Sequence, residues 1–382
     1  MRRDLFEDEH EQYRQSVRAF IAQEVVPNYA DWERAGIVPR SLFTQLADLG
    51  ALSFGVPEEY GGSGVDDFRY NVILSEEGSR ANVQPAVIGP SLVVDIVMPY
   101  LLEMGDDEQK ARWLPGIVAG DTITAIAMTE PGTGSDLSGI QTKGVRDGDD
   151  WIVDGAKTFI TNGINADLVV VAVRTGEHRH QGLSLMVLER GMPGFERGRK
   201  LDKIGMHAQD TAELSFTGVR VPAANLLGAV GDGFAGLTRN LAQERVSAAA
   251  AAVAGAETAL ALTVDYVRQR RAFGHPIGKM QATRFALAEL STEIDIARVF
   301  VDRCILAVNA GELTPVDAAK AKWWTTELLG RVTDRGLQLH GGYGYMTDYP
   351  IGRAWADSRV QRIYAGSTET MKDLIGRSMD LG

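Results

Sequence analysis

The spacing of apolar residues divides this chain into three regions. In the first, residues 7–119, apolar side chains such as Val17, Phe20 and Ile21 recur three or four positions apart. That spacing places them on one face of a helix. Glycines and prolines interrupt the pattern at several points, so a series of helices is expected rather than one long helix. We assign residues 1–120 to an N-terminal helical domain.

Short β-rich runs replace the helical pattern in the second region, residues 121–230. Turn signals such as Asp147-Gly148-Asp149 separate these runs. Strands this short and regularly spaced are typical of a compact antiparallel barrel or sandwich rather than of alternating strands and helices. The expected strands are Thr122–Met128, Trp151–Val153, Leu168–Val173, Leu183–Leu188 and Glu213–Phe216.

Helical spacing returns in the third region, residues 231–382. Its longest segment runs from Leu237 to Arg270, and its main breaks are Gly341–Gly344 and Pro350. The predicted fold class is therefore mostly α, with a central β domain between two helical ones. Borders between packed regions of this kind are places where ligands preferentially bind.

Composition and charge narrow the possible partners and locations. The formal net charge of -12 argues against a nucleic acid or an anionic membrane surface as the main partner. The alanine-rich run from Ala248 to Ala261 is interrupted by Glu257, so a packed helix is expected rather than a membrane span. The N-terminus lacks the apolar stretch of a signal peptide, and Cys304 is the only cysteine, which favours a cytoplasmic location.

Gly231 to Gly236 matches the G-x-G-x-x-G pattern of dinucleotide-binding loops. That pattern is informative only between a strand and a helix of a βαβ unit, with an acidic residue about 20 positions later at a strand end. Here an alanine-rich helical pattern follows, and Glu257 lies inside it. We interpret the glycines as a flexible start to a long helix.

Metal and nucleophile chemistry lack support in the sequence. His178 and His180 have no carboxylate at ligand spacing, so no metal site is expected. The chain also lacks the G-x-S-x-G motif of serine hydrolases. An organic cofactor is then the leading route to chemistry.

Four motifs in a fixed order carry the most specific signal in the sequence. They are Val56–Gly64 (VPEEYGGSG); Ala127–Asp136 (AMTEPGTGSD) leading to Phe159–Gly163 (FITNG); Arg270–Gly274 (RRAFG) with Gln281; and Gln338–Tyr345 (QLHGGYGY) with Tyr364–Glu369 (YAGSTE). Together, and with these spacings, they resemble the acyl-CoA dehydrogenase family over nearly the whole chain. The resemblance implies an N-terminal helical bundle (1–120), a middle β-barrel (121–230) and a C-terminal four-helix bundle (231–382).

The resemblance also implies an FAD cofactor and assigns contacts to its flavin end. Thr129 and the backbone around Met128 match the strand edge that meets the flavin ring. Phe159 matches an aromatic wall beside the ring, and it offers the π-face that a flat ring needs. Thr161 matches the threonine that hydrogen-bonds near flavin N5, and Ser135 matches a contact to the FAD pyrophosphate that also lies in the substrate site.

A second set of matched residues implies an oligomer. In the family, the corresponding positions reach the pyrophosphate and adenosine part of FAD from a neighbouring subunit, usually in a homotetramer. An arginine suits a pyrophosphate because its charged hydrogen bonds are strong, and glycines let the backbone approach a ligand closely. Each residue alone could be an ordinary helix-surface or loop residue; the joint match favours the cofactor. The set comprises Arg270, Phe273, Gln281, Gln338, Gly341 and Gly342, with Ser367 and Glu369 as further cofactor contacts.

The position of the catalytic base departs from most of the family. Most members have a glutamate directly before the glycine that matches Gly366, whereas this chain has Ala365, which cannot accept a proton. Long-chain and isovaleryl-CoA dehydrogenases instead use a glutamate that precedes an arginine early in the long helix after the β domain. Glu244, followed by Arg245, occupies that place here. Glu369 is an alternative base, although the family uses that position as a polar contact near the cofactor.

The neighbours of Glu244 on a helix support this assignment. They are mostly small or apolar, so they would partly desolvate the carboxylate and raise its pKa, which favours a base that works near neutral pH. The same-face neighbours are Asn240, Leu241, Ser247 and Ala248.

The resemblance then implies a complete reaction. An acyl-CoA thioester is converted to a trans-2-enoyl-CoA: Glu244 removes the α-proton, and a hydride passes from the β-carbon to flavin N5. The backbone N–H of Ala365 polarises the thioester carbonyl, and Arg245 and Gly366 belong to the substrate site. Reduced flavin passes its electrons to an electron-transfer flavoprotein.

Two other functions remain open from the sequence. One is a dehydrogenase or oxidase that acts on an acyl group bound to an acyl carrier protein in lipid or secondary-metabolite synthesis. The other is a flavoprotein scaffold without catalytic activity, which the loss of a carboxylate at Ala365 favours and the presence of Glu244 opposes.

Overall fold

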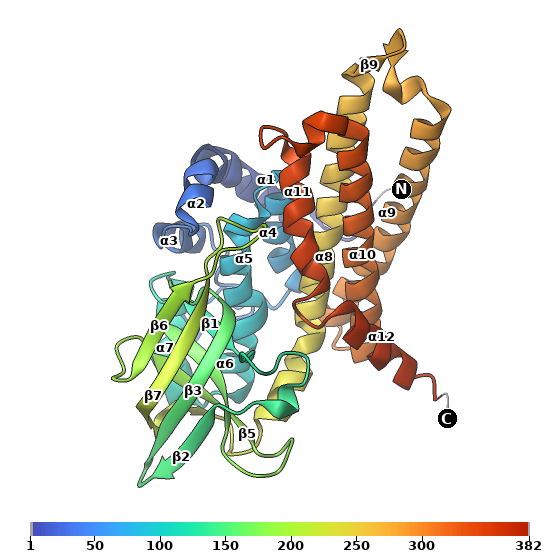
Figure 1. Ribbon diagram of the computed structural model, residues 1–382. Helices are drawn as coiled ribbons and strands as arrows, with labels where there is room; N and C mark the ends of the chain where they lie inside the picture. The colour runs from blue at the N-terminus through green and yellow to red at the C-terminus, as the bar shows by residue number, and fades with distance from the viewer. Residues whose placement is uncertain (1–2, 381–382) are drawn as a thin grey trace.

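The computed structural model describes residues 3–380 and combines two helical regions with one sheet (Figure 1). The N-terminal helices lie above the sheet and partly between the sheet and the C-terminal bundle (Figure 1). Helix α8 (Gly233–Gln269) runs from the sheet to the far end of the bundle and connects the two regions (Figure 1). The predicted class, mostly α with a central β domain, is confirmed.

The N-terminal region forms a series of helices, as the broken helical pattern predicted. A π-helical turn, Val93–Val97, links α5 to α6, so that the two helices continue one another. A similar turn, Ile21–Val25, extends α1. The α-helices are α1 (Asp8–Phe20), α2 (Tyr29–Ala35), α3 (Ser41–Asp48), α4 (Phe68–Arg80), α5 (Gln84–Leu92), α6 (Met98–Met104) and α7 (Asp107–Val118).

The middle region forms one eight-stranded sheet with the strand order β6-β7-β3-β2-β4-β5-β8, and β1 pairs with β4. Most neighbours are antiparallel, but β1 and β2 pair with β4 in parallel. The expected antiparallel pairing is confirmed for most strands and was wrong for these two pairs. The β2–β3 hairpin separates β1 from β4 in the chain, which allows the two strands to align in parallel. The strands are β1 (Thr124–Ala127), β2 (Lys143–Asp147), β3 (Asp150–Thr161), β4 (Leu168–Arg174), β5 (Leu183–Glu189), β6 (Phe195–Lys200), β7 (Thr211–Pro222) and β8 (Leu226–Leu227).

Strand β4 shows why the middle region reads as continuous apolar runs. Val169 and Val171 belong to the hydrophobic cluster that the strands enclose among themselves. Leu168 and Val170 point to the other face and join the cluster formed by the N-terminal helices. Because both faces are buried, no polar alternation is needed. The shared cluster packs sheet and helices together, and the predicted domain border at 120/121 stays a prediction.

The C-terminal region is a helical bundle, as predicted, built on α8. In its buried core, α8 contributes several alanines, such as Ala249, Ala252 and Ala256, which allow neighbouring helices to pack closely. A short hairpin, Arg271–Ala272 with His275–Pro276, connects α8 to α9. The other helices are α9 (Gln281–Asn309), α10 (Pro315–His340), α11 (Pro350–Ser358) and α12 (Thr368–Arg377).

The glycines of the G-x-G-x-x-G pattern serve close packing. A Cβ on Gly233 would lie 2.8 Å from the carbonyl oxygen of Leu183, and one on Gly236 would lie 2.4 Å from the sulfur of Met104. The interpretation as a flexible helix start was therefore incomplete, since these positions have no room for a side chain. No dinucleotide-binding βαβ unit surrounds them in the described residues.

Two helical segments are long and apolar enough to cross a membrane by length and composition alone: Gln84–Met104 and Gly233–Gln269. The most apolar window of each is mostly buried inside the fold, 72% and 61% respectively. Core helices of globular proteins pass the same test, and the alanine-rich segment of α8 packs here as predicted.

Candidate active site

Glu244 lies on α8 and is 4% exposed. The hydroxyl of Tyr100, on α6, donates a 3.0 Å hydrogen bond to its Oε1. Burial raises the pKa of Glu244 to about 7, while the bond from Tyr100 and the charge of Arg245 oppose that rise. The predicted desolvation of this carboxylate is confirmed, and its pKa matches the task of a base that works near neutral pH.

A second buried carboxylate, Asp95, lies against the same face of α8. The Ser247 hydroxyl donates to its carboxylate, and Gln243 Nε2 donates to its backbone carbonyl at 3.1 Å. Burial raises the pKa of Asp95 to about 6, despite hydrogen bonds from Ser247 and Asn71. Its Oδ1 has no hydrogen-bond partner among residues 3–380. Two buried carboxylates, Glu244 and Asp95, therefore lie at this face of α8.

Lys322 and Arg245 connect the turn that contains Ala365 to Glu244. Lys322, on α10, is fully buried and donates a 2.5 Å hydrogen bond to the carbonyl oxygen of Gly366. Burial and the charge of Arg245 lower the pKa of Lys322 to about 8. Arg245 is itself buried, and its Nε has no hydrogen-bond partner among residues 3–380. The structure therefore brings the predicted residues Glu244, Arg245 and Gly366 into one neighbourhood.

The backbone of the turn is unusual. Ala365 has a φ of 52°, in the left-handed region that alanine rarely adopts, and Gly366 has a φ of 91°. Ser367 caps the following helix α12 by accepting a 3.2 Å hydrogen bond from the N–H of Thr370. Glu369 is exposed in the first turn of α12, where hydrogen bonds from its own backbone N–H and from Ser367 lower its pKa. A lowered pKa makes Glu369 a weaker candidate base than Glu244.

The predicted flavin-contacting edge extends beyond β1 and is fixed to β3. Thr158 donates its N–H to the carbonyl of Thr129 at 2.9 Å. Lys157, fully buried, donates to the carbonyl of Met128 at 3.1 Å and to Glu130 Oε1 at 2.8 Å. Burial raises the pKa of Glu130, but its bonds to Lys157 and to two backbone N–H groups outweigh this and lower it. This buried ion pair holds the edge in place.

Phe159 and Thr161 lie at the same end of β3, where the pairing with β7 is irregular between Lys157 and Ile160. A bulge of this kind redirects side chains. Phe159 has a φ of 60° and is 67% exposed, which is unusual for a large aromatic residue. The two preceding residues, Lys157 and Thr158, bond to the Met128–Thr129 edge, so this exposed ring directly follows the segment joined to it, which fits a flat aromatic cofactor.

The structure ties this end of β3 to the helices near Glu244. Asn162, which directly follows Thr161, donates to the carbonyl of Gly89 on α5 and to that of Thr124 on β1, both at 3.1 Å. Since α5 continues through Val93–Val97 into α6, Asn162 connects this end of β3 to the helical run that carries Tyr100. Ser135 lies on an exposed bend beyond the edge, where the structure leaves it open to a ligand.

The remaining predicted cofactor residues gather at the far end of the bundle. Arg270 ends α8 and lies 5.5 Å from the ring centre of Tyr343, beside a cavity of about 460 Å³. Gly341 has a φ of 60° and open space where a side chain would lie, and it lines the same cavity with Gly342. Phe273 is 90% exposed at the tip of the short hairpin. Gln281 begins α9, and Gln338 lies near the end of α10; both are exposed.

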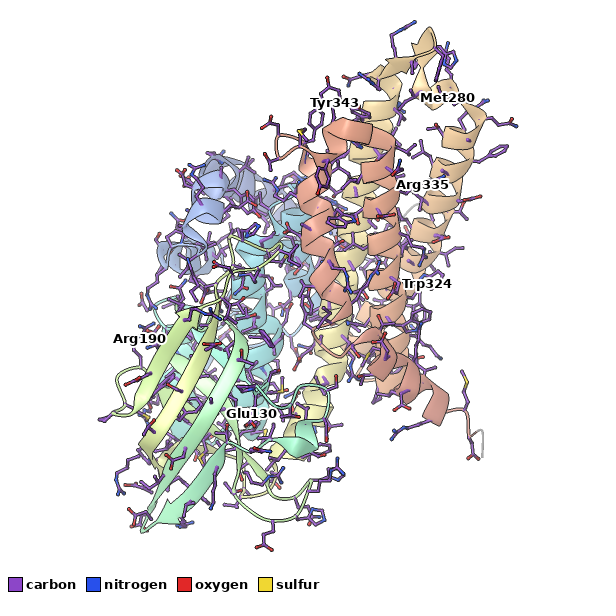
Figure 2. The ribbon with its side chains drawn as sticks, viewed as in Figure 1. Glu130, Arg190, Met280, Trp324, Arg335 and Tyr343 are labelled. Atoms are coloured by element: carbon purple, nitrogen blue, oxygen red, sulfur yellow. The ribbon has the colours of Figure 1, made fainter. Side chains whose placement is uncertain are left out.

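The two sets of cofactor residues do not meet within one chain. Glu244 and Arg270 are 26 residues apart on one helix, which corresponds to about 39 Å at 1.5 Å per residue. Figure 2 shows Tyr343, beside Arg270, near the top of the molecule and Glu130, next to the predicted flavin-contacting edge, in its lower half. The two predicted sets therefore lie far apart within one chain, and the prediction that a neighbouring subunit supplies the far set stays a prediction.

Several site residues were missed by the sequence reasoning. Tyr100 precedes Glu244 by 144 residues and has no motif around it. Lys322 and Lys157 are both fully buried, although lysine is almost never buried without a partner. For Lys157 the sequence does offer a signal. Its partner Glu130 lies inside the matched motif AMTEPGTGSD.

A carboxylate whose burial raises its pKa to about 7, together with a strand edge that carries an exposed aromatic ring, fits the class of enzymes that use a flat organic cofactor. Comparison with known proteins gives the family. The acyl-CoA dehydrogenase N-terminal, middle and C-terminal domain families match residues 7–121, 125–219 and 231–379. The chain belongs to the acyl-CoA dehydrogenase family and is an FAD-dependent oxidoreductase.

The similarity to individual proteins extends over almost the whole chain. The mitochondrial long-chain specific acyl-CoA dehydrogenase of Sus scrofa is 46% identical over 380 residues, which cover 99% of this chain and 88% of that protein. The crystal structure of an acyl-CoA dehydrogenase from Geobacillus kaustophilus superimposes with a TM-score of 0.96 at 49% identity, covering 98% of this chain and 99% of that one.

A more distant structure concerns the cofactor. The glutaryl-CoA dehydrogenase of Mycobacterium smegmatis, solved in complex with FADH2, has a TM-score of 0.90 at 26% identity and covers 98% of this chain and 95% of that one. The predicted FAD cofactor is confirmed by the family, and the predicted roles of single residues stay predictions.

Proposed function

We propose that this enzyme converts an acyl-CoA to a trans-2-enoyl-CoA, with Glu244 as the base that removes the α-proton. The observation that carries the proposal is the burial of Glu244, which raises its pKa to about 7. At pH 8 such a group is mostly ionised, yet it retains enough basicity to accept a proton from carbon.

Several groups of the chain contribute to the proposed removal of the α-proton. Glu244 Oε1 is held by the Tyr100 hydroxyl, which fixes the direction of the carboxylate. The backbone N–H of Ala365 donates to the thioester carbonyl oxygen and stabilises the negative charge that develops there as the α-proton leaves. Arg245, buried and adjacent to Glu244, adds positive charge on the same side.

The Met128–Thr129 edge, Phe159 and Thr161 hold the flavin end of FAD. When bound, FAD supplies an acceptor for the hydride that leaves the β-carbon. By family resemblance, an electron-transfer flavoprotein then receives the electrons.

We further propose that the enzyme is a homotetramer, in which Arg270, Gly341 and Gly342 of one copy bind the distal half of a cofactor held by its neighbour. The separation of about 39 Å along α8 supports this arrangement. Equilibrium sedimentation of the FAD-bound protein tests it: a stable monomer that keeps FAD through dialysis would contradict it.

The test of the function is anaerobic mixing of the FAD-bound enzyme with acyl-CoAs of increasing chain length, followed through the oxidised flavin absorbance. We expect rapid bleaching by at least one chain length. Glu244→Gln should retain FAD and bind the acyl-CoA, but it should bleach at least about 100-fold more slowly, the low end of general-base contributions. Glu257→Gln, the same change farther along α8, is the matched control and should bleach at the wild-type rate.

Three outcomes would contradict the proposal. Near-normal bleaching by Glu244→Gln would remove Glu244 as the base. Bleaching by acyl groups on an acyl carrier protein, but by none on CoA, would assign the enzyme to carrier-bound substrates. A protein that binds FAD and is bleached by neither would be a scaffold without catalytic activity.

A further inference from the structure

Lys322 is a buried lysine to which the proposed reaction assigns no role. It is fully buried in α10, and the described residues give its ammonium group one hydrogen bond, to the carbonyl oxygen of Gly366. Burying a charged group is unfavourable unless its interactions compensate. Its only direct partner is therefore informative, because that carbonyl belongs to the turn next to the proposed oxyanion donor.

The turn needs support to keep its shape. Ala365 adopts a φ of 52° that an alanine leaves readily unless its surroundings hold it. Helix α10 contacts the turn and the start of the helix that follows it. Lys322 donates to the carbonyl of Gly366, and Glu327 accepts a 2.9 Å hydrogen bond from the hydroxyl of Thr368, the first residue of α12.

The charges around Lys322 are consistent with such a clamp. Arg245 lies close enough for its charge to lower the pKa of Lys322, while the carboxylates of Glu327 and Glu369 act in the opposite direction. Arg245 in turn is adjacent to Glu244. The ammonium group is thus linked through one carbonyl to the turn that contains Ala365.

We infer that Lys322 is a positioning residue: through Gly366 it fixes the direction of the Ala365 N–H toward the thioester carbonyl oxygen. The inference rests on the proposed function. It differs from a purely structural role because it concerns the polarisation of a bound carbonyl. A misplacement of about 1 Å in a catalytic group can reduce a rate by about 100-fold.

The experiment has two readouts. The first is the infrared stretch of the carbonyl in [1-13C]trans-2-enoyl-CoA, bound to the oxidised FAD-bound enzyme, which cannot react further. The second is the limiting rate of anaerobic flavin bleaching by an acyl-CoA. Lys322→Met is the variant, and Lys320→Met, an exposed lysine on the same helix, is the matched control.

We expect the wild type and Lys320→Met to shift the carbonyl stretch to lower frequency than in water. Lys322→Met should lose at least half of that shift and bleach about 10- to 100-fold more slowly, with FAD content and acyl-CoA affinity within about threefold of wild type. Should Lys322→Met not fold, Lys322→Gln, which lacks both the charge and the reach, takes its place with the same expectation.

Unchanged carbonyl frequency and rate in a folded Lys322 variant would overturn the inference and leave the proposed function intact. An unshifted carbonyl in the wild type would overturn it without any variant. A wild-type enzyme that no acyl-CoA bleaches would instead contradict the proposed function.

Discussion

Two glutamates of this enzyme are equally buried but have opposite pKa shifts. Glu76, on α4, accepts hydrogen bonds from Arg3, Arg14 and Arg298 at 2.8–3.0 Å. Burial raises the pKa of Glu76, but the three arginines more than offset it and lower it to about 2. Among residues 3–380, Glu244 has one neutral donor, Tyr100, and one adjacent charge, Arg245, and its pKa rises to about 7.

The difference shows that the partners, and not burial itself, decide what a buried carboxylate does. Glu76 is ionised over the whole working pH range and links α1, α4 and α9. Glu244 can exchange a proton near neutral pH because its surroundings do not fully compensate its charge. The charge of Glu76 stabilises the contact between helices. The charge of Glu244 is poorly compensated, which suits a residue that exchanges a proton.

Glu76→Gln should have the largest effect on stability. It leaves three arginines around a neutral group, and breaking a buried ion pair by removing one partner costs about 3–5 kcal/mol. We expect the free energy of unfolding to fall by that amount at pH 8, as measured by urea denaturation. Glu289→Gln, on the exposed face of α9, is the control and should change it by less than about 0.5 kcal/mol.

The same comparison predicts the pH dependence of this loss. A folded pKa of about 2, below the ordinary value of 4.5, contributes stability above pH 4.5 that disappears as the pH falls toward 2. A loss independent of pH would show that Glu76 acts through packing alone.

Glu244→Gln should change stability in the opposite direction. Its folded pKa of about 7 exceeds the ordinary value of 4.5, so stability is fully present below pH 4.5 and falls as the pH rises through 7. The variant should therefore unfold like the wild type at pH 4.5 and gain up to about 3 kcal/mol at pH 8. Urea denaturation at both pH values measures this; a less stable variant at pH 8 would mean that the charge of Glu244 is compensated.

Tyr100→Phe should have the smallest effect. It removes the one direct hydrogen bond to Glu244, and bonds to charged groups contribute about 1.5 kcal/mol, so the pKa of Glu244 should rise by about one unit. The bleaching rate should then fall below pH 7 and recover at higher pH. A loss of rate that is equal at every pH would assign Tyr100 a role in substrate binding instead.

Periodicity predicted the helical regions well, because their patterns are local. α8 was expected from Leu237 to Arg270 and runs from Gly233 to Gln269. Strand β6, Phe195–Lys200, was missed because most of its residues are polar or glycine and only Phe195 is buried. The parallel pairing of β1 with β4 depends on contacts between distant segments, which local patterns do not report.

Site residues that belong to motifs could be predicted from the sequence. Residues that contact them from distant parts of the chain could not. Glu244 was identified from its local match and the alanine at position 365. Tyr100 could not be connected to it, since the contact joins α6 and α8 only in the folded chain. Lys322 carries a charge that sequence reasoning places on a helix surface, whereas the structure buries it completely.

The most direct test of the central claim is the pH dependence of the second-order rate constant for anaerobic flavin bleaching by acyl-CoA. This constant reports the ionisation of the free enzyme. If Glu244 is the base, the constant should rise about tenfold per pH unit below pH 7 and level off above it, with an inflection near 7 that Tyr100→Phe moves upward. A constant that does not change between pH 5.5 and about 9, or an inflection that stays in place in Tyr100→Phe, would contradict the account.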